Sequence, residues 1–153
     1  MLRAGAHLPQ LGGLIRFDPS GGTRVYHCGP VIAAAGVVAA GPTTSARMKD
    51  LSGFLLDAGV RALIGKGGMG PAVREGLGGR GVYLAFTGGC AALAAARMRL
   101  VGVYYEDLGM AEAVWQIELD RLPLIVGIDA SGGDLFADVG QKAKIHFEQR
   151  FNK

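Results

Sequence analysis

The turn Gly41-Pro42-Thr43-Thr44-Ser45-Ala46-Arg47-Met48 joins an apolar strand to an amphipathic helix. The strand is Val-Val-Ala-Ala at residues 37–40, and the Gly-Pro pair that follows ends it. Three consecutive hydroxyl side chains, from Thr43 to Ser45, can then accept hydrogen bonds from the free N–H groups of the helix. The turn therefore predicts a hydroxyl-rich helix N-terminus.

A helix N-terminus attracts anions because it carries about half a positive charge and several unpaired N–H donors. Arg47 lies near this end, and its planar guanidinium can bind a carboxylate or phosphate through two hydrogen bonds. Lys66 follows the buried strand predicted at residues 60–64, and α/β sheets bind ligands at the carboxyl ends of their strands. We expect Thr43, Arg47 and Lys66 to form one anion site. An ordinary capped helix with two solvated cations is the alternative.

Strands and helices alternate along the rest of the chain. The predicted strands are 24–28, 37–40, 60–64, 82–86, one from about 101, 114–119 and 124–128, and the predicted helices are 45–58, 71–77, 90–97 and 139–151. We expect the first two strands to pair as a hairpin through residues 33–36. The alternation predicts an α/β fold with parallel strands.

The length of 153 residues fits a single domain with a sizeable core. Residues 1–22 are punctuated by Pro and Gly, and we interpret them as an irregular N-terminal segment with a shortened start. The domain proper is expected to span residues 23–153.

The charge and hydropathy of the chain exclude several classes of protein. The net charge is only +3, and no dense Lys/Arg run indicates a nucleic-acid surface. This excess suits a dianionic substrate, although Arg residues scattered over a solvated face would also explain it. No apolar run reaches the roughly 20 residues that a membrane-spanning helix needs. Without a secretory signal at Met1, we expect a cytoplasmic protein.

Two cysteines, Cys28 and Cys90, lie far apart and lack the paired spacing of a zinc site or disulfide framework. We expect them to be small buried thiols and no metal ligands. His27 beside Cys28 suggests a nucleophile pair, but adjacent residues on a strand point to opposite faces. A structural role is therefore favoured for both.

The segment Gly65-Lys66-Gly67-Gly68-Met69-Gly70 matches the pattern G-x-G-x-x-G between a predicted strand and helix. This pattern binds dinucleotides in many α/β proteins, but the acidic residue expected about 20 positions later is replaced by Phe86-Thr87-Gly88-Gly89. It is not a Walker loop either, because Gly67 follows Lys66 where Ser or Thr is required. A nucleotide-binding domain that uses residues 65–70 stays an alternative function.

Several segments, in order, resemble the beta subunit or C-terminal domain of iron-sulfur-dependent class I fumarate hydratases and L-tartrate dehydratases. The resemblance spans roughly residues 20–150. Its motifs are His27-Cys28-Gly29-Pro30, Gly41 to Met48, Gly59 to Gly67, Phe86 to Ala92, Asp107-Leu108-Gly109-Met110 and Trp115-Gln116-Ile117-Glu118. The family's fold is a swivelling β/β/α domain, which the resemblance implies here.

The resemblance also implies roles for residues of the turn. Thr43 matches a hydroxyl that takes part in proton abstraction with an Asp of the other domain. Arg47 matches a clamp on a substrate carboxylate, Lys66 a second polar contact, and Thr44 is expected to bind substrate beside them. The implied reaction is the reversible hydration or dehydration of a small dicarboxylate, such as fumarate, malate or tartrate.

By the same resemblance, a 4Fe–4S cluster belongs to a partner alpha subunit, and Cys28 and Cys90 match no cluster ligand. The implied assembly is a heterotetramer of alpha and beta chains. One family feature is missing, because we align residues 1–9 with a segment after the family's Arg-Asp motif, which leaves Arg3 a weak candidate for its arginine. A truncated, non-catalytic interaction module is therefore a further alternative.

Overall fold

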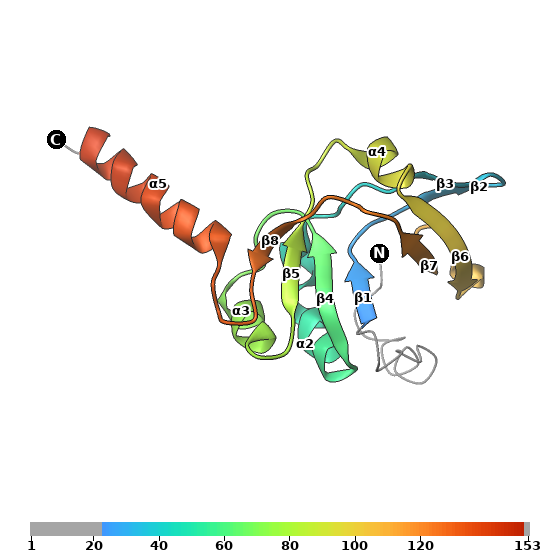
Figure 1. The fold of residues 1–153 in the computed structure, drawn as a ribbon, viewed down its shortest axis with the longest axis horizontal. Coiled ribbons are helices and arrows are strands. Elements are labelled where there is room, and N and C mark those ends of the chain that lie inside the picture. The colour runs from blue at the N-terminus through green and yellow to red at the C-terminus, as the bar shows by residue number, and fades with distance from the viewer. Residues whose placement is uncertain (1–22, 152–153) are drawn as a thin grey trace.

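The computed structural model describes residues 23–151 (Figure 1). The predicted N-terminal segment 1–22, with the candidate Arg3, lies outside the described residues. Within the described part of the chain, no helix is long and apolar enough to cross a membrane.

A four-stranded mixed sheet lies at the centre of the fold, in the order β1-β4-β5-β8. Strands β1 (Thr23–Tyr26), β4 (Val60–Gly65) and β5 (Val82–Ala85) are parallel, whereas β8 (Ile125–Ile128) is antiparallel to β5. The predicted α/β class and the parallel strands are confirmed. The carboxyl ends of β1, β4 and β5 meet at one edge of the sheet (Figure 1).

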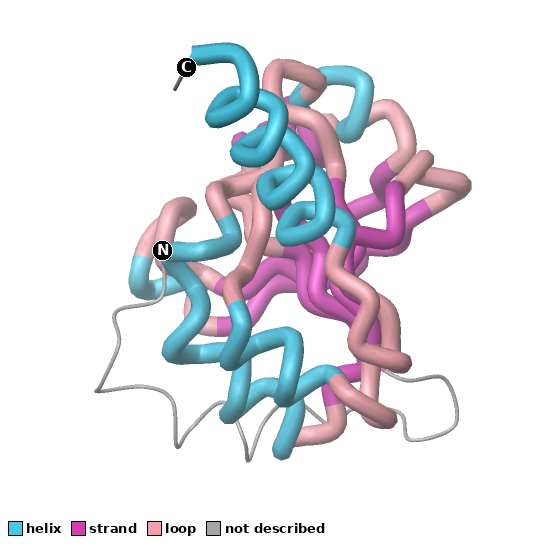
Figure 2. Tube along the Cα trace, turned by 90° about the vertical axis from the view of Figure 1, so that its left-hand side faces the viewer, coloured by secondary structure: helices cyan, strands magenta, loops and turns pink. Residues whose placement is uncertain are grey.

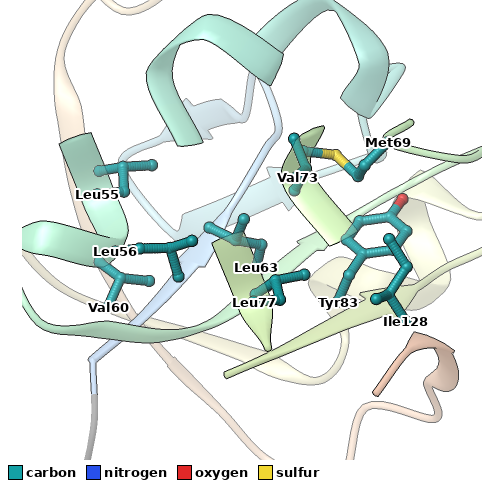
Figure 3. Packing of buried hydrophobic residues seen from close by; sticks show 9 residues of the cluster. All are labelled: Leu55, Leu56, Val60, Leu63, Met69, Val73, Leu77, Tyr83 and Ile128. Carbon is teal, nitrogen blue, oxygen red and sulfur yellow. The ribbon is translucent and has the colours of Figure 1, made fainter. Parts of the chain in front are cut away.

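Helices α2 (Lys49–Asp57) and α3 (Pro71–Leu77) pack together and cover the sheet (Figure 2). Every residue of β4 except Arg61 is buried, as expected for an apolar strand with a strand on either side and helices above it. The core combines helix, strand and loop residues: Leu55, Leu56, Val60, Leu63, Met69, Val73, Leu77, Tyr83 and Ile128 (Figure 3).

Two antiparallel hairpins and a short helix form the other side of the domain. Strand β2 (Val31–Ala33) pairs with β3 (Gly36–Ala39), and β6 (Met98–Tyr104) pairs with β7 (Val114–Leu119). Helix α4 (Ala91–Ala95) contacts β3, and the 3₁₀ turn η2 (Glu106–Leu108) lies between β6 and β7.

The predicted hairpin between residues 24–28 and 37–40 is wrong. The first of these segments forms β1 and pairs in parallel with β4, while the partner of β3 is β2. The turn itself is correctly placed, because residues 34–35 connect β2 to β3 and Gly36 directly after them adopts a φ of 109°, which favours glycine. The apolar Val31–Ala33 segment simply offers β3 a nearer partner.

The helix predicted over residues 45–58 begins instead as a 3₁₀ turn, η1 (Ser45–Met48), which continues into α2. No side-chain hydrogen bond caps η1 at Thr44 or α2 at Met48, so the predicted hydroxyl cap is wrong. The Ser45 side chain is fully buried and bonds to core groups instead.

Helix α5 (Leu135–Phe151) starts four residues earlier than predicted and extends away from the body of the domain (Figure 1). Buried Asp134 caps it, since its carboxylate accepts the N–H groups of Phe136 and Ala137 at 3.0 and 3.1 Å. No described residue of α5 is buried.

Candidate functional site

The segments that carry Thr43 and Lys66 lie side by side at the carboxyl edge of the parallel strands. Thr44 and Lys66 form a parallel β-bridge. The Ser45 N–H donates to the Lys66 carbonyl at 3.0 Å, and the Lys66 N–H donates to the Thr43 carbonyl at 3.2 Å. Two loops that are distant in sequence are therefore joined by backbone hydrogen bonds.

The end of β1 holds the same segment from the other side. The Thr43 N–H donates to the His27 carbonyl at 2.7 Å, and the His27 N–H donates to the Ile64 carbonyl at 2.7 Å. An isolated bridge between Cys28 and Pro42 extends this contact. Three backbone attachments thus determine where Thr43 lies relative to the sheet.

The candidate side chains at this edge are accessible to a ligand. Thr43, Thr44 and Lys66 are partly exposed and Arg47 is exposed. The Arg47 N–H donates to the Thr44 carbonyl at 3.2 Å, which places Arg47 one turn beyond the bridge. The aliphatic part of Lys66 passes over Gly88 in the loop after β5, where a Cβ would lie 3.5 Å from its Cδ and 3.7 Å from its Nζ.

This arrangement offers groups that match a dicarboxylate. Thr43 and Thr44 are hydroxyl donors, Lys66 supplies a point charge, and Arg47 supplies a planar fork of donors. The backbone contacts bring Thr43, Thr44 and Lys66 together, and Arg47 follows them on η1. The segments 43–47 and 65–68 carry two cationic side chains, Arg47 and Lys66, and no acidic one.

A buried polar chain beneath the site was not foreseen from the sequence. Tyr83 Oη lies 2.7 Å from the Gly67 carbonyl oxygen and 3.1 Å from Ser45 Oγ, which is 3.4 Å from His27 Nδ1. His27, Ser45 and Tyr83 are all buried. We call the hydrogen-bonded series His27, Ser45, Tyr83 and Gly67, which ends at the Gly67 carbonyl, the core chain.

The glycines of residues 65–70 are explained by the packing of this protein. A Cβ on Gly65 would overlap the Ser45 hydroxyl, and one on Gly68 would lie 3.2 Å from Phe136 Cβ. The other two pattern glycines have φ values of 72° and 91°, which favour glycine. No glycine of the pattern therefore requires a bound phosphate to explain it.

The cysteines do not fit an iron-sulfur cluster, which is normally held by several thiolates. The chain has only two, and burial raises the pKa of Cys28 to about 12, so it stays a neutral thiol. Cys90 accepts a hydrogen bond from the Thr87 hydroxyl at 3.4 Å. Among the described residues, no group of three or more His, Cys, Asp or Glu side chains can hold a metal ion.

Comparisons with known proteins identify the family of this chain. The family model described as Fumarase C-terminus matches residues 1–139. "Putative L(+)-tartrate dehydratase subunit beta" of Methanocaldococcus jannaschii is 41% identical over 127 residues, which cover 77% of this chain and 65% of the relative. "L(+)-tartrate dehydratase subunit beta" of Escherichia coli K12 is 38% identical over 125 residues, covering 76% and 62%.

A third relative places the similarity inside a longer protein. "Putative fumarate hydratase class I" of Geobacillus stearothermophilus is 37% identical over 126 residues, which cover 77% of this chain but only 24% of the relative. The chain spans less than two thirds of the length of each of these relatives.

Proposed function

The chain belongs to the Fumarase C-terminus family, and from this premise we propose that it is the beta subunit of an iron-sulfur hydro-lyase. The substrate class is a small dicarboxylate, fumarate or malate or tartrate, which undergoes reversible hydration or dehydration. The observation that carries the proposal is the bridge between Thr44 and Lys66, which gathers hydroxyl and cationic groups at one sheet edge in a chain similar to tartrate dehydratase beta subunits.

In this proposal each residue has a distinct role. Arg47 binds one carboxylate through two parallel hydrogen bonds, because a guanidinium fits the spacing of carboxylate oxygens. Lys66 and Thr44 contact the substrate beside it. Thr43 is the catalytic hydroxyl, and since a hydroxyl alone is a weak base, it needs a carboxylate of the partner to accept its proton.

We assign the 4Fe–4S cluster to a partner alpha subunit. The two cysteines of this chain do not fit as its ligands, because such a cluster is normally held by several thiolates. The proposal includes a heterotetramer in the cytoplasm and a swivelling β/β/α domain that closes on the alpha chain. The chain purified alone should therefore contain no stoichiometric iron.

The proposal is tested by reconstitution. The chain is co-expressed with a cluster-bearing alpha chain of the same family, purified without oxygen, and assayed with fumarate, malate and L-tartrate. Activity that requires both chains supports the proposal. A stable complex without activity on any of the three would identify an interaction module, and activity or stoichiometric iron in this chain alone would overturn the proposed division of roles.

A further inference from the structure

The direction of each hydrogen bond in the core chain follows from its end point. A carbonyl oxygen only accepts, so the single phenolic proton of Tyr83 is donated to Gly67. Tyr83 Oη then accepts from the Ser45 hydroxyl, whose oxygen accepts from His27 Nδ1–H. His27 is therefore the Nδ1–H tautomer. All donors point the same way, so the bonds polarise one another.

The opposite direction leaves more polar groups without partners. If Ser45 donated to His27 Nδ1, Tyr83 would need two protons, and the His27 Nε2 would carry a buried N–H. Nε2 has no partner among the described residues, so a bare lone pair is the less costly state there. Burial lowers the pKa of His27 to about 4 and raises the pKa of Tyr83 despite the Ser45 hydrogen bond, so both stay neutral near pH 7.

The core chain is attached to both loops of the candidate site. Ser45 donates its backbone N–H to the Lys66 carbonyl, while Tyr83 holds the carbonyl of the next residue, Gly67. The Lys66 N–H returns to the Thr43 carbonyl. The backbone of Lys66 is therefore held at its own carbonyl by Ser45 and at the next carbonyl by Tyr83.

The hydroxyls of the core chain cannot act on substrate directly. Ser45 and Tyr83 are each 0% exposed. The space that Ser45 occupies exists only because Gly65 has no Cβ. Any effect of these hydroxyls on a ligand must therefore pass through the backbone of the two loops.

We propose that Ser45 and Tyr83 are positioning residues, which hold the segment of Thr43 and Arg47 in register with the segment of Lys66. The consequence for catalysis rests on the proposed function, whereas the effect on the two loops is a property of this chain alone. A substrate held by both segments is sensitive to their relative placement, because small displacements of bound groups reduce rates strongly.

Amide hydrogen exchange in the full chain tests the positioning without any assay of activity. Tyr83→Phe removes the hydroxyl and keeps the ring in the core. We expect the Ser45 and Lys66 amides to exchange about fivefold faster, since a hydrogen bond contributes about 1 kcal/mol. The amides of Ala94 and Asp120, which bond elsewhere in the domain, should change much less.

Two comparisons separate positioning from general loss of stability. Tyr104→Phe removes the same hydroxyl from a tyrosine that is 39% exposed on β6, and no amide of the site should respond. Ser45→Ala should accelerate the same two amides as Tyr83→Phe, and the double variant should add little, because either change breaks the chain. Equal acceleration of the site amides and the two reference amides, in both single variants, overturns the positioning role.

The second test measures the kinetics of the reconstituted complex. Tyr83→Phe should lower kcat/KM about tenfold, with the Tyr104→Phe complex unchanged, as misplacement of bound groups predicts. A normal kcat/KM despite faster loop exchange would overturn the catalytic consequence. An inactive wild-type complex would refute the proposed function instead, and the exchange measurement then decides the positioning role by itself.

Discussion

Thr44 and Lys66 are 22 positions apart in the sequence and form a parallel β-bridge at the carboxyl edge of the central sheet. At the bridge, the Thr43 carbonyl accepts the Lys66 N–H and the Lys66 carbonyl accepts the Ser45 N–H. The side chains of Thr43, Thr44 and Lys66 are therefore left as the groups that this edge can offer to a ligand.

Arg47→Lys keeps the charge but removes the pair of parallel donors. In the reconstituted enzyme we expect kcat/KM to fall by about 5- to 150-fold, which corresponds to roughly 1 to 3 kcal/mol for a bidentate carboxylate contact. The melting temperature should not change, because Arg47 is exposed. Arg97→Lys, at another exposed arginine, is the matched control. Wild-type kinetics in Arg47→Lys would show that Arg47 is a solvated surface residue that does not bind the substrate.

Lys66→Met removes a charge while keeping the aliphatic length that passes over Gly88. We expect the KM for the dicarboxylate to rise by about tenfold, since a charge-assisted hydrogen bond contributes about 1.5 kcal/mol or more. Calorimetry with ATP and NAD should show no binding to the wild-type chain or to the variant. Nucleotide binding that Lys66→Met abolishes would favour the nucleotide-binding alternative.

Gly65→Ala should destabilise the domain because its new methyl group overlaps the Ser45 hydroxyl in a fully buried place. Overpacking of this kind costs about 1 to 3 kcal/mol, which urea unfolding can measure. Adding Ser45→Ala should recover part of the loss, since the remaining contacts are with Ser45 Cβ at 3.2 Å and with His27 Nδ1 at 3.4 Å. Additive losses in the double variant would show that the two residues do not compete for one space.

The elements with a local cause were predictable. The apolar run of β4 and the alternation of β7 predict their bounds closely, and Pro71 opens α3 as expected. The choice of strand partners could not be predicted. Residues 24–26 have the composition of a hairpin strand, and their pairing with β4 depends on the whole sheet.

At the site, the sequence predicted which loops meet and missed what supports them. A serine in a run of hydroxyls has the composition of a helix cap. Its inward rotation depends on the absence of a Cβ at Gly65 and on a tyrosine 38 positions away, and no local pattern contains either fact. The sequence signal for this contact was a glycine, Gly65, in one loop and a small polar residue, Ser45, in the other.

His27 should make the stability of the domain depend on pH in a defined window. Its pKa is about 6.5 when unfolded and is lowered by burial to about 4 in the folded chain. Between these values the unfolded chain binds the extra proton, so the free energy of unfolding falls as the pH falls from 6.5 to 4. Above 6.5 and below 4 the contribution of His27 is constant. The loss across the window is about 3 kcal/mol.

The measurement is urea unfolding at several pH values for the wild type, His27→Gln and His146→Gln. Carboxylates titrate in the same window, so the informative quantity is the difference between wild type and variant at each pH. We expect His27→Gln to lose less stability on acidification than the wild type, while His146→Gln, at an exposed position on α5, follows the wild type. Parallel pH curves for wild type and His27→Gln would mean that the folded domain accommodates a charged His27.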